Sequence, residues 1–249
     1  MPLPHYYSKL APFLQLFLSG RPILTFHHVG RRPRGARIKG LYVSPGLFAK
    51  QLAELKAAGF STPLYESVTE PETPRGSVIF LTFDDGFRDV FENALPVMQA
   101  HKFRGIQFLV SGLIGKTNEW QQKAGDVSEP LMNEAQVRDW LAAGQQIGSH
   151  TQTHPRLTQI SPSAAAEEIK ASKKSLEDQF GVPIDHFCYP YGDWNERVRD
   201  LVIAAGYKTA CTTLTGLNTR AEPPFQLKRF TSRYPSRSLK ALWSRLRAS

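Results

Sequence analysis

The sequence predicts an α/β fold in which helices cover one parallel β-sheet within a single domain. Strand and helix patterns alternate along the whole chain of 249 residues, which favours a parallel sheet. About seven such units follow one another without a linker or a repeat, which favours a closed or nearly closed barrel. Hydrophobic residues make up 41% of the chain, which is enough for a full core. An open, doubly wound sheet is the alternative.

Four strands and two helices are expected in the first half of the chain. Ser44 and Pro45 predict the start of a helix, because serine caps free amides and proline suits the first turn, and Gly59 ends it. A second helix is expected over residues 88–101, directly after Gly86. Apolar, β-branched and aromatic runs predict the strands, which are residues 22–29, 60–64, 78–83 and 105–110.

The second half continues the alternation. Residues 115–130 are polar and predict an insertion or a lid loop. Asn133 predicts a helix start, with Gln136 at the capping-box position, and Gly144 ends that helix. The remaining elements are expected at 145–149, 184–189, 207–212 and 225–231 for strands, and at 161–179 and 195–205 for helices.

The two ends are expected to flank a central domain of residues 21–235. Residues 1–20 are expected to form an N-terminal apolar segment, whose apolar run from Leu10 to Leu18 is too short to span a membrane and is interrupted by Pro12 and Gln15. This segment could pack on the domain as a helix, which we favour, or lie on a membrane surface. Residues 236–249 are expected to form a basic helix. If residues 1–20 lie on a membrane surface, the side chains that would enter the membrane are Phe13, Leu14, Phe17 and Leu18.

The charge and the cysteine count limit the partners and the compartment. Lysine and arginine outnumber aspartate and glutamate by 31 to 22, and a net charge of +9 favours anionic partners. No nucleic-acid partner is expected, because basic and aromatic residues do not interleave and zinc-finger spacing is absent. The two cysteines, Cys188 and Cys211, favour a reducing, cytoplasmic compartment. We add the hypothesis of peripheral contact with an anionic surface of the inner membrane.

Two adjacent carboxylates, Asp84 and Asp85, follow the predicted strand 78–83. Side by side, they repel each other, which raises one pKa unless a cation or hydrogen bonds offset the repulsion. Gly86 lets the chain turn sharply after them. A plain polar turn is the simpler interpretation of this motif taken alone. The other strand ends change that interpretation.

His150 and His154 follow the strand 145–149, and Tyr189 to Gly192 follow the strand 184–189. In a β/α barrel the carboxyl ends of the strands converge on one face, where active sites lie. Two imidazoles and one carboxylate leave coordination positions open, which is typical of a catalytic metal site. Zinc is the expected metal, and cobalt, nickel, manganese or iron would accept the same ligands.

These motifs resemble those of a known family, the polysaccharide deacetylases, which include chitooligosaccharide-deacetylase-like carbohydrate esterases. The stretch Thr82-Phe83-Asp84-Asp85-Gly86 resembles the first motif, His150-Thr151-x-x-His154 the second and Tyr189-Pro190-Tyr191-Gly192 the third. The resemblance covers residues 21–232. It implies a distorted, TIM-like (β/α)7 barrel and metal-dependent removal of acetyl from an N-acetylated sugar of a polysaccharide, an oligosaccharide or a lipid-linked glycan.

The resemblance also implies roles for single residues. Asp85, His150 and His154 hold the metal, and Asp84 is the general base. The backbone N–H of Tyr191 helps to stabilise the oxyanion.

The chain departs from the family pattern at three places. Cys188 stands where many members have the arginine that pairs with the catalytic aspartate, and Arg229 could replace that arginine. The histidine that usually supplies the general acid is absent from Leu227-Lys228-Arg229, so His27 is our candidate acid, with a structural histidine as the alternative. Trp194 could form a sugar-stacking wall or serve packing alone.

Three functions remain open at this point. The first is a carbohydrate N-deacetylase, a hydrolase of carbon–nitrogen bonds other than peptide bonds. The second is an O-acetyl esterase, or a hydrolase of another linear amide, that uses the same site. The third is a non-catalytic glycan-binding descendant, which Cys188 and the missing histidine would suggest.

Overall fold

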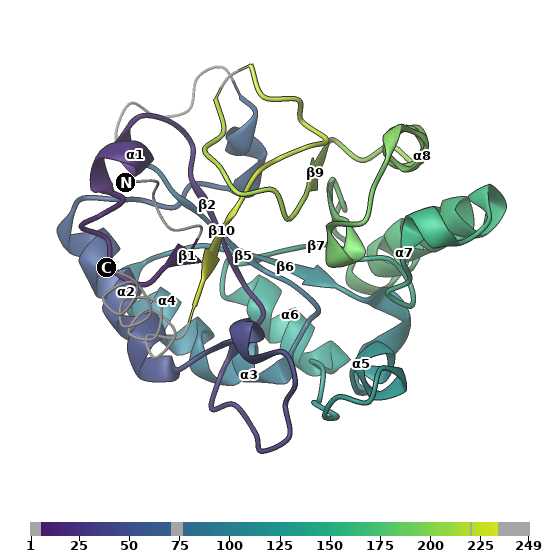
Figure 1. Cartoon of the computed structure of the whole chain (residues 1–249), viewed down its shortest axis with the longest axis horizontal. Helices are drawn as coiled ribbons and strands as arrows, with labels where there is room; N and C mark the ends of the chain where they lie inside the picture. The colour runs from purple at the N-terminus through teal and green to yellow at the C-terminus, as the bar shows by residue number, and fades with distance from the viewer. Residues whose placement is uncertain (1–5, 71–76, 220, 234–249) are drawn as a thin grey trace, which may run out of the picture.

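The computed structural model describes residues 6–70, 77–219 and 221–233, and its central feature is a curled parallel sheet surrounded by helices (Figure 1). The strand order in this sheet is β1-β10-β2-β5-β6-β7-β8-β9, and every pairing is parallel. Its strands are β1 (Tyr6–Tyr7), β2 (Ile23–Phe26), β5 (Phe80–Phe83), β6 (Ile106–Leu109), β7 (Gln146–Ser149), β8 (His186–Cys188), β9 (Thr209–Cys211) and β10 (Phe230–Ser232). A separate small ladder joins β3 (His28–Val29) to β4 (Tyr42–Val43).

Helices connect most of the neighbouring strands along the outside of the sheet (Figure 1). The α-helices are α1 (Leu14–Leu18), α2 (Pro45–Ala57), α3 (Arg88–Asn93), α4 (Leu95–His101), α5 (Glu119–Lys123), α6 (Glu134–Ala142), α7 (Pro162–Phe180) and α8 (Glu196–Ala204). Short 3-10 turns are η1 (Lys39–Leu41), η2 (Tyr65–Val68), η3 (Ser111–Leu113), η4 (Leu157–Gln159) and η5 (Pro190–Gly192). The predicted capping box at Asn133 and Gln136 is confirmed at the start of α6.

The sheet curls until its last strand meets the segment that leads into β10. Cys211 of β9 forms a parallel bridge with Leu227, and the Ala210 N–H donates to the carbonyl of Pro224. The edge strand β9 is therefore partly covered, which relieves the exposed edge of an open sheet. The predicted distorted barrel in a single domain is confirmed, and the open doubly wound sheet is not what forms.

Alternation along the strands separates an outer core from an inner one. Phe26 and Phe83 stack outside the sheet, with ring centroids 5.3 Å apart, and Trp140 of α6 packs edge-on against Phe83. Ile23 and Phe80 belong instead to a cluster with residues of β6, β8 and β9. Because side chains alternate with a period of two, the same inward rows continue toward the carboxyl ends of the strands. The inner face of the sheet thus leads directly to the candidate site.

Several of the expected elements differ from the structure. The strand expected over 22–29 divides at His27 into β2 and β3, which belong to different sheets. The helix expected over 88–101 is two helices that break at Ala94, because Pro96 has no N–H to continue the ladder. The strand expected at 60–64 is reduced to one bridge between Ser61 and Val78. The strand expected over 225–231 is also wrong at its start, because only residues from Phe230 onward pair as β10, while Leu227 bridges to β9.

The described part of the N-terminal segment belongs to the barrel. Tyr6–Tyr7 pairs with β10, and Phe13 and Phe17 are buried against Phe230 at centroid distances of 5.9 Å and 5.2 Å. These two side chains therefore pack on the domain, as the favoured alternative expects. No helix in the described ranges is long and apolar enough to cross a membrane. The expected helix at 236–249 lies outside the described residues, and the boundaries at 21–235 stay a prediction.

Candidate metal and catalytic site

The two carboxylates lie where β5 ends, and a left-handed turn sends them to different partners. The Asp84 N–H donates to the carbonyl of Phe26 and continues the β2–β5 ladder by one residue. Asp85 then has a φ of 76° and Gly86 a φ of 85°. Aspartate tolerates this conformation better than most side chains, and glycine adopts it freely. Both carboxylates are buried.

Arg229 binds the Asp84 carboxylate through both terminal nitrogens of its guanidinium group. Nη1 lies 2.7 Å from Oδ1, and Nη2 lies 2.8 Å from Oδ2. The remaining donors bind the Thr212 carbonyl, the Thr82 hydroxyl and the Sγ atom of Cys188. Arg229 therefore stands in the place that the sequence suggested for it, and Cys188 lies beside it as an acceptor.

Burial and this arginine act in opposite directions on Asp84. Burial by itself raises the pKa of the Asp84 carboxyl, but the charge of Arg229 and the nearby His27 outweigh it and hold the pKa below its ordinary value. Asp84 is consequently ionised at neutral pH and can accept a proton.

The loop after β7 directs both histidines toward Asp85. The His150 N–H extends the β6–β7 ladder to the Leu109 carbonyl. Thr151 and His154 both have left-handed backbones, with φ of 70° and 65°, and the Thr151 hydroxyl accepts the His154 N–H at 3.0 Å. The segment from His150 to His154 is a loop and not a regular helix. Nε2 of each histidine comes within 3.3 Å of Oδ1 of Asp85.

The donor set fits a metal ion. Ligand atoms of Asp85, His150 and His154 lie within 4.8 Å of one another, and all three side chains are buried. Nδ1 of His150 lies 2.7 Å from the Cys188 carbonyl, so that nitrogen donates and leaves the Nε2 lone pair facing Asp85. Three converging electron-pair donors away from water need a cation or protons between them.

The pKa of Asp85 and that of His154 are both lowered in this cluster. Burial acts to raise the pKa of Asp85, but the contacts with His150 and His154 outweigh burial and hold that pKa well below its ordinary value. Burial lowers the pKa of His154, and the neighbouring Asp85 offsets this only in part. An ionised carboxylate next to a neutral imidazole is the state in which both groups bind a metal.

His27 faces the same cavity from the end of β2. Its Nε2 lies 3.7 Å from Oδ2 of Asp84, and its side chain is 23% exposed. Burial lowers its pKa, while Asp85 and Asp84 act in the opposite direction. His28, the next residue, points away from the site, because successive side chains alternate along an extended chain, and its Nδ1 lies 3.0 Å from Oδ2 of Asp89.

The third motif brings Tyr191 to the cavity but not Trp194. Tyr191 has a φ of 60° inside η5, and its ring packs edge-on against His154 at a centroid distance of 4.6 Å. The Gly192 N–H donates to the Tyr189 carbonyl and is the first N–H to bond within η5. The Tyr191 N–H comes one residue earlier and is not needed for the turn. Trp194 stacks on Tyr189 at 5.9 Å and, within the described residues, is not part of the cavity lining. Its proposed sugar contact stays a prediction that this placement does not favour.

A cavity of about 830 Å³ covers these groups, and part of its wall was missed by sequence reasoning. Trp120 of α5 stacks on the His154 ring at 4.4 Å. Arg37 donates to the Ala124 carbonyl, and its backbone N–H donates to Asp126, which joins two loops at the rim. A tryptophan inside the polar stretch 115–130 was the available signal for Trp120. Nothing in the sequence indicated the contact between Arg37 and Asp126.

Comparisons with known proteins agree with the fold and the motifs. The family model for polysaccharide deacetylases matches residues 72–210, which is more than half of the chain. YxkH of Bacillus subtilis (strain 168) is 26% identical over 212 residues, which cover 84% of this chain and 70% of YxkH. The peptidoglycan-N-acetylglucosamine deacetylase PgdA of Listeria monocytogenes is 28% identical over 154 residues, which cover 60% of this chain and only 30% of PgdA.

A solved structure extends the similarity to nearly the whole chain. The Streptococcus pyogenes deacetylase PplD in complex with acetate is similar with a TM-score of 0.76 and 26% identity. The match covers 89% of this chain and 97% of PplD. The matched family model, the motifs at the strand ends and this similarity show that the chain belongs to the polysaccharide deacetylase family.

Proposed function

We propose that the protein is a metal-dependent carbohydrate N-deacetylase, which hydrolyses the acetamido group of an N-acetylated sugar. The observation that carries this proposal is the convergence of Asp85, His150 and His154 beside a separately held carboxylate, Asp84. Amide hydrolysis needs an activated water, a base, a donor for the oxyanion and an acid for the leaving amine. The cavity presents a candidate for each of these tasks.

Asp85, His150 and His154 would hold the metal. A divalent cation there would supply Lewis-acid chemistry, which makes a water easier to deprotonate for attack on an amide at neutral pH. Zinc is the metal we expect from two nitrogens and one oxygen, and cobalt, nickel, manganese and iron would accept the same donors. Trp120 and Tyr191 contact the His154 ring from two sides and restrict its rotation.

Asp84 would take the proton of the attacking water. Its bidentate contact with Arg229 keeps the carboxylate charged and fixes its direction, so that little reorganisation is needed. Because this contact also lowers its basicity, Asp84 depends on a water that is already acidified.

His27 would give a proton to the leaving amine. Its lowered pKa means that the imidazole is neutral before the reaction, so it must first receive a proton. Asp84, 3.7 Å away, is the nearest group that gains one during the attack. The proton would therefore move from water to Asp84, then to His27 and finally to the amine nitrogen as the carbon–nitrogen bond breaks.

The backbone N–H of Tyr191 would stabilise the negative charge on the carbonyl oxygen. The first N–H that bonds within η5 is that of Gly192, so the Tyr191 N–H, which precedes it, makes no bond within this turn. The acetate held by the similar deacetylase PplD is the product that such a reaction releases.

Acetate release tests the proposal. We would supply N-acetylhexosamine oligomers and their O-acetylated counterparts to the purified protein, with and without a chelator. Chelator-sensitive release from the N-acetyl compounds would support N-deacetylation. Release from the O-acetyl compounds alone would favour the esterase, and saturable glycan binding without release would favour the non-catalytic alternative.

The cytoplasmic location and the contact with an anionic membrane surface stay proposals. The net charge of +9 supports contact with anionic lipids. Flotation with vesicles containing anionic lipids is the test, and absence of the protein from the lipid fraction would count against membrane contact.

A further inference from the structure

The loop that carries both histidine ligands has an unfavourable backbone. Thr151 is β-branched and left-handed, with a φ of 70°, and His154 is left-handed with a φ of 65°. Such residues persist only when neighbouring groups hold them in place. The backbone N–H groups between the two histidines must therefore find acceptors that fix this shape.

One carboxylate provides these acceptors. Oε2 of Glu168 accepts the N–H groups of Gln152 and Thr153, each at 2.9 Å. Oε1 of the same side chain accepts the Thr153 hydroxyl at 2.6 Å. We propose that Glu168 is a positioning residue, which holds the loop from His150 to His154 in the shape that directs both imidazoles to Asp85.

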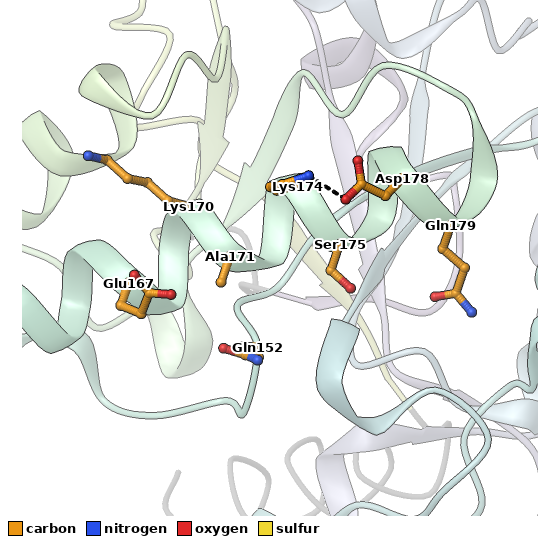
Figure 2. A pocket seen from close by; sticks show the side chains of 8 residues that line it. All are labelled: Gln152, Glu167, Lys170, Ala171, Lys174, Ser175, Asp178 and Gln179. Carbon is orange, nitrogen blue, oxygen red and sulfur yellow. Dashed lines mark hydrogen bonds and ion pairs between the residues drawn. The ribbon is translucent and has the colours of Figure 1, made fainter.

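The helix that carries Glu168 is fixed to the strand that leads into the loop. The Ser172 hydroxyl lies 2.7 Å from the hydroxyl of Ser149, the last residue of β7. Glu168 and Ser172 are four residues apart, so they lie on one face of α7. That face contacts the chain just before His150 through Ser172 and just after it through Glu168. Figure 2 shows Gln152 on the loop beside this helix.

The other side of the loop is fixed by backbone contacts. The Ser111 and Gly112 N–H groups donate to the carbonyls of Thr151 and Gln152, each at 3.0 Å. A Cβ atom on Gly112 would lie 2.7 Å from the Gln152 carbonyl, so only glycine allows this approach. The carbonyls are thus held by η3 and the N–H groups by Glu168, and removing Glu168 would release one side.

This inference rests on the metal in the proposed function, so its test measures metal binding and not turnover. We would titrate the metal-free protein with zinc against a chromophoric chelator and record the spectrum of the cobalt form. Glu168→Gln should weaken metal binding about 10-fold, the lower end of the effect of losing a group that orients metal ligands, because Glu168 acts through the loop between the two histidines. Glu167→Gln is the matched control, because Glu167 is the exposed neighbour on the same helix and should leave the affinity unchanged.

The outcomes separate positioning from stability alone. A folded Glu168→Gln variant with the wild-type metal affinity and the wild-type cobalt spectrum would overturn the inference, even if its Tm were lower. If that variant does not fold, Thr153→Val decides, because it removes only the hydroxyl contact. A several-fold weaker affinity that Thr153→Ser restores would support the inference, and an unchanged affinity would overturn it. Wild-type protein that binds no metal would instead overturn the proposed function together with the inference.

Discussion

Replacing Arg229 with methionine should destabilise the protein strongly. The substitution removes a buried guanidinium whose two bonds to Asp84 measure 2.7 Å and 2.8 Å and leaves the carboxylate buried without its partner. Breaking one side of a buried ion pair costs about 3–5 kcal/mol. In a chain of this size about 1 kcal/mol shifts the Tm by 2–4 °C, so the Tm should fall by roughly 6–20 °C.

Thermal and denaturant unfolding of the metal-free protein would measure this effect. Arg104→Met is the matched control, because Arg104 is exposed, and it should change stability by less than about 0.5 kcal/mol. The double variant Arg229→Met with Asp84→Asn removes both charges. It should therefore be more stable than the sum of the two single effects predicts, by about 1–3 kcal/mol. Strict additivity, or a loss below about 1 kcal/mol for Arg229→Met, would refute the reasoning.

Three further predictions concern other parts of the molecule. Trp120→Leu removes the stack on His154, worth about 0.5–1.5 kcal/mol, and should weaken metal binding roughly 2- to 12-fold in the chelator titration, whereas an unchanged affinity would show that the stack is dispensable. Asn133→Ala should cost about 1 kcal/mol in unfolding free energy through loss of the capping box, and an effect near zero would contradict this. His186 and the Gln146 amide lower the pKa of Glu66 to about 2, so the ionised Glu66 stabilises the fold above the unfolded pKa of about 4.3. The stability difference between wild type and Glu66→Gln should therefore be present at pH 7 and shrink as pH falls from about 4.3 toward 2, and a difference that grows over this window would have the wrong sign.

The convergence of Asp85, His150 and His154 could be predicted from the sequence because local rules suffice for it. Asp85 and His150 each follow a strand of one parallel sheet, and parallel strands end on the same face. Arg229 could be suggested because it lies near the carboxyl end of the strand expected over 225–231, although the observed β10 begins only at Phe230. The break at Ala94 was missed in the helix expected over 88–101, although Pro96 marks it in the sequence.

Other features depend on contacts that no local pattern encodes. Trp120 reaches His154 from an insertion, and Glu168 reaches Gln152 from the next helix. Both belong to segments whose own patterns indicate only surface structure. Trp194 shows the converse, because a motif-like position placed it near the site, whereas packing against Tyr189 directs it away from the cavity.

The central claim is that Asp84 acts as the base while Asp85, His150 and His154 hold the metal. The most direct measurement is acetate release per bound metal ion by the Asp84→Asn variant, with wild type as the reference. The account predicts that the variant keeps its metal and loses at least about 100-fold in turnover, the usual contribution of a general base. Near-normal release per bound metal by Asp84→Asn would contradict it.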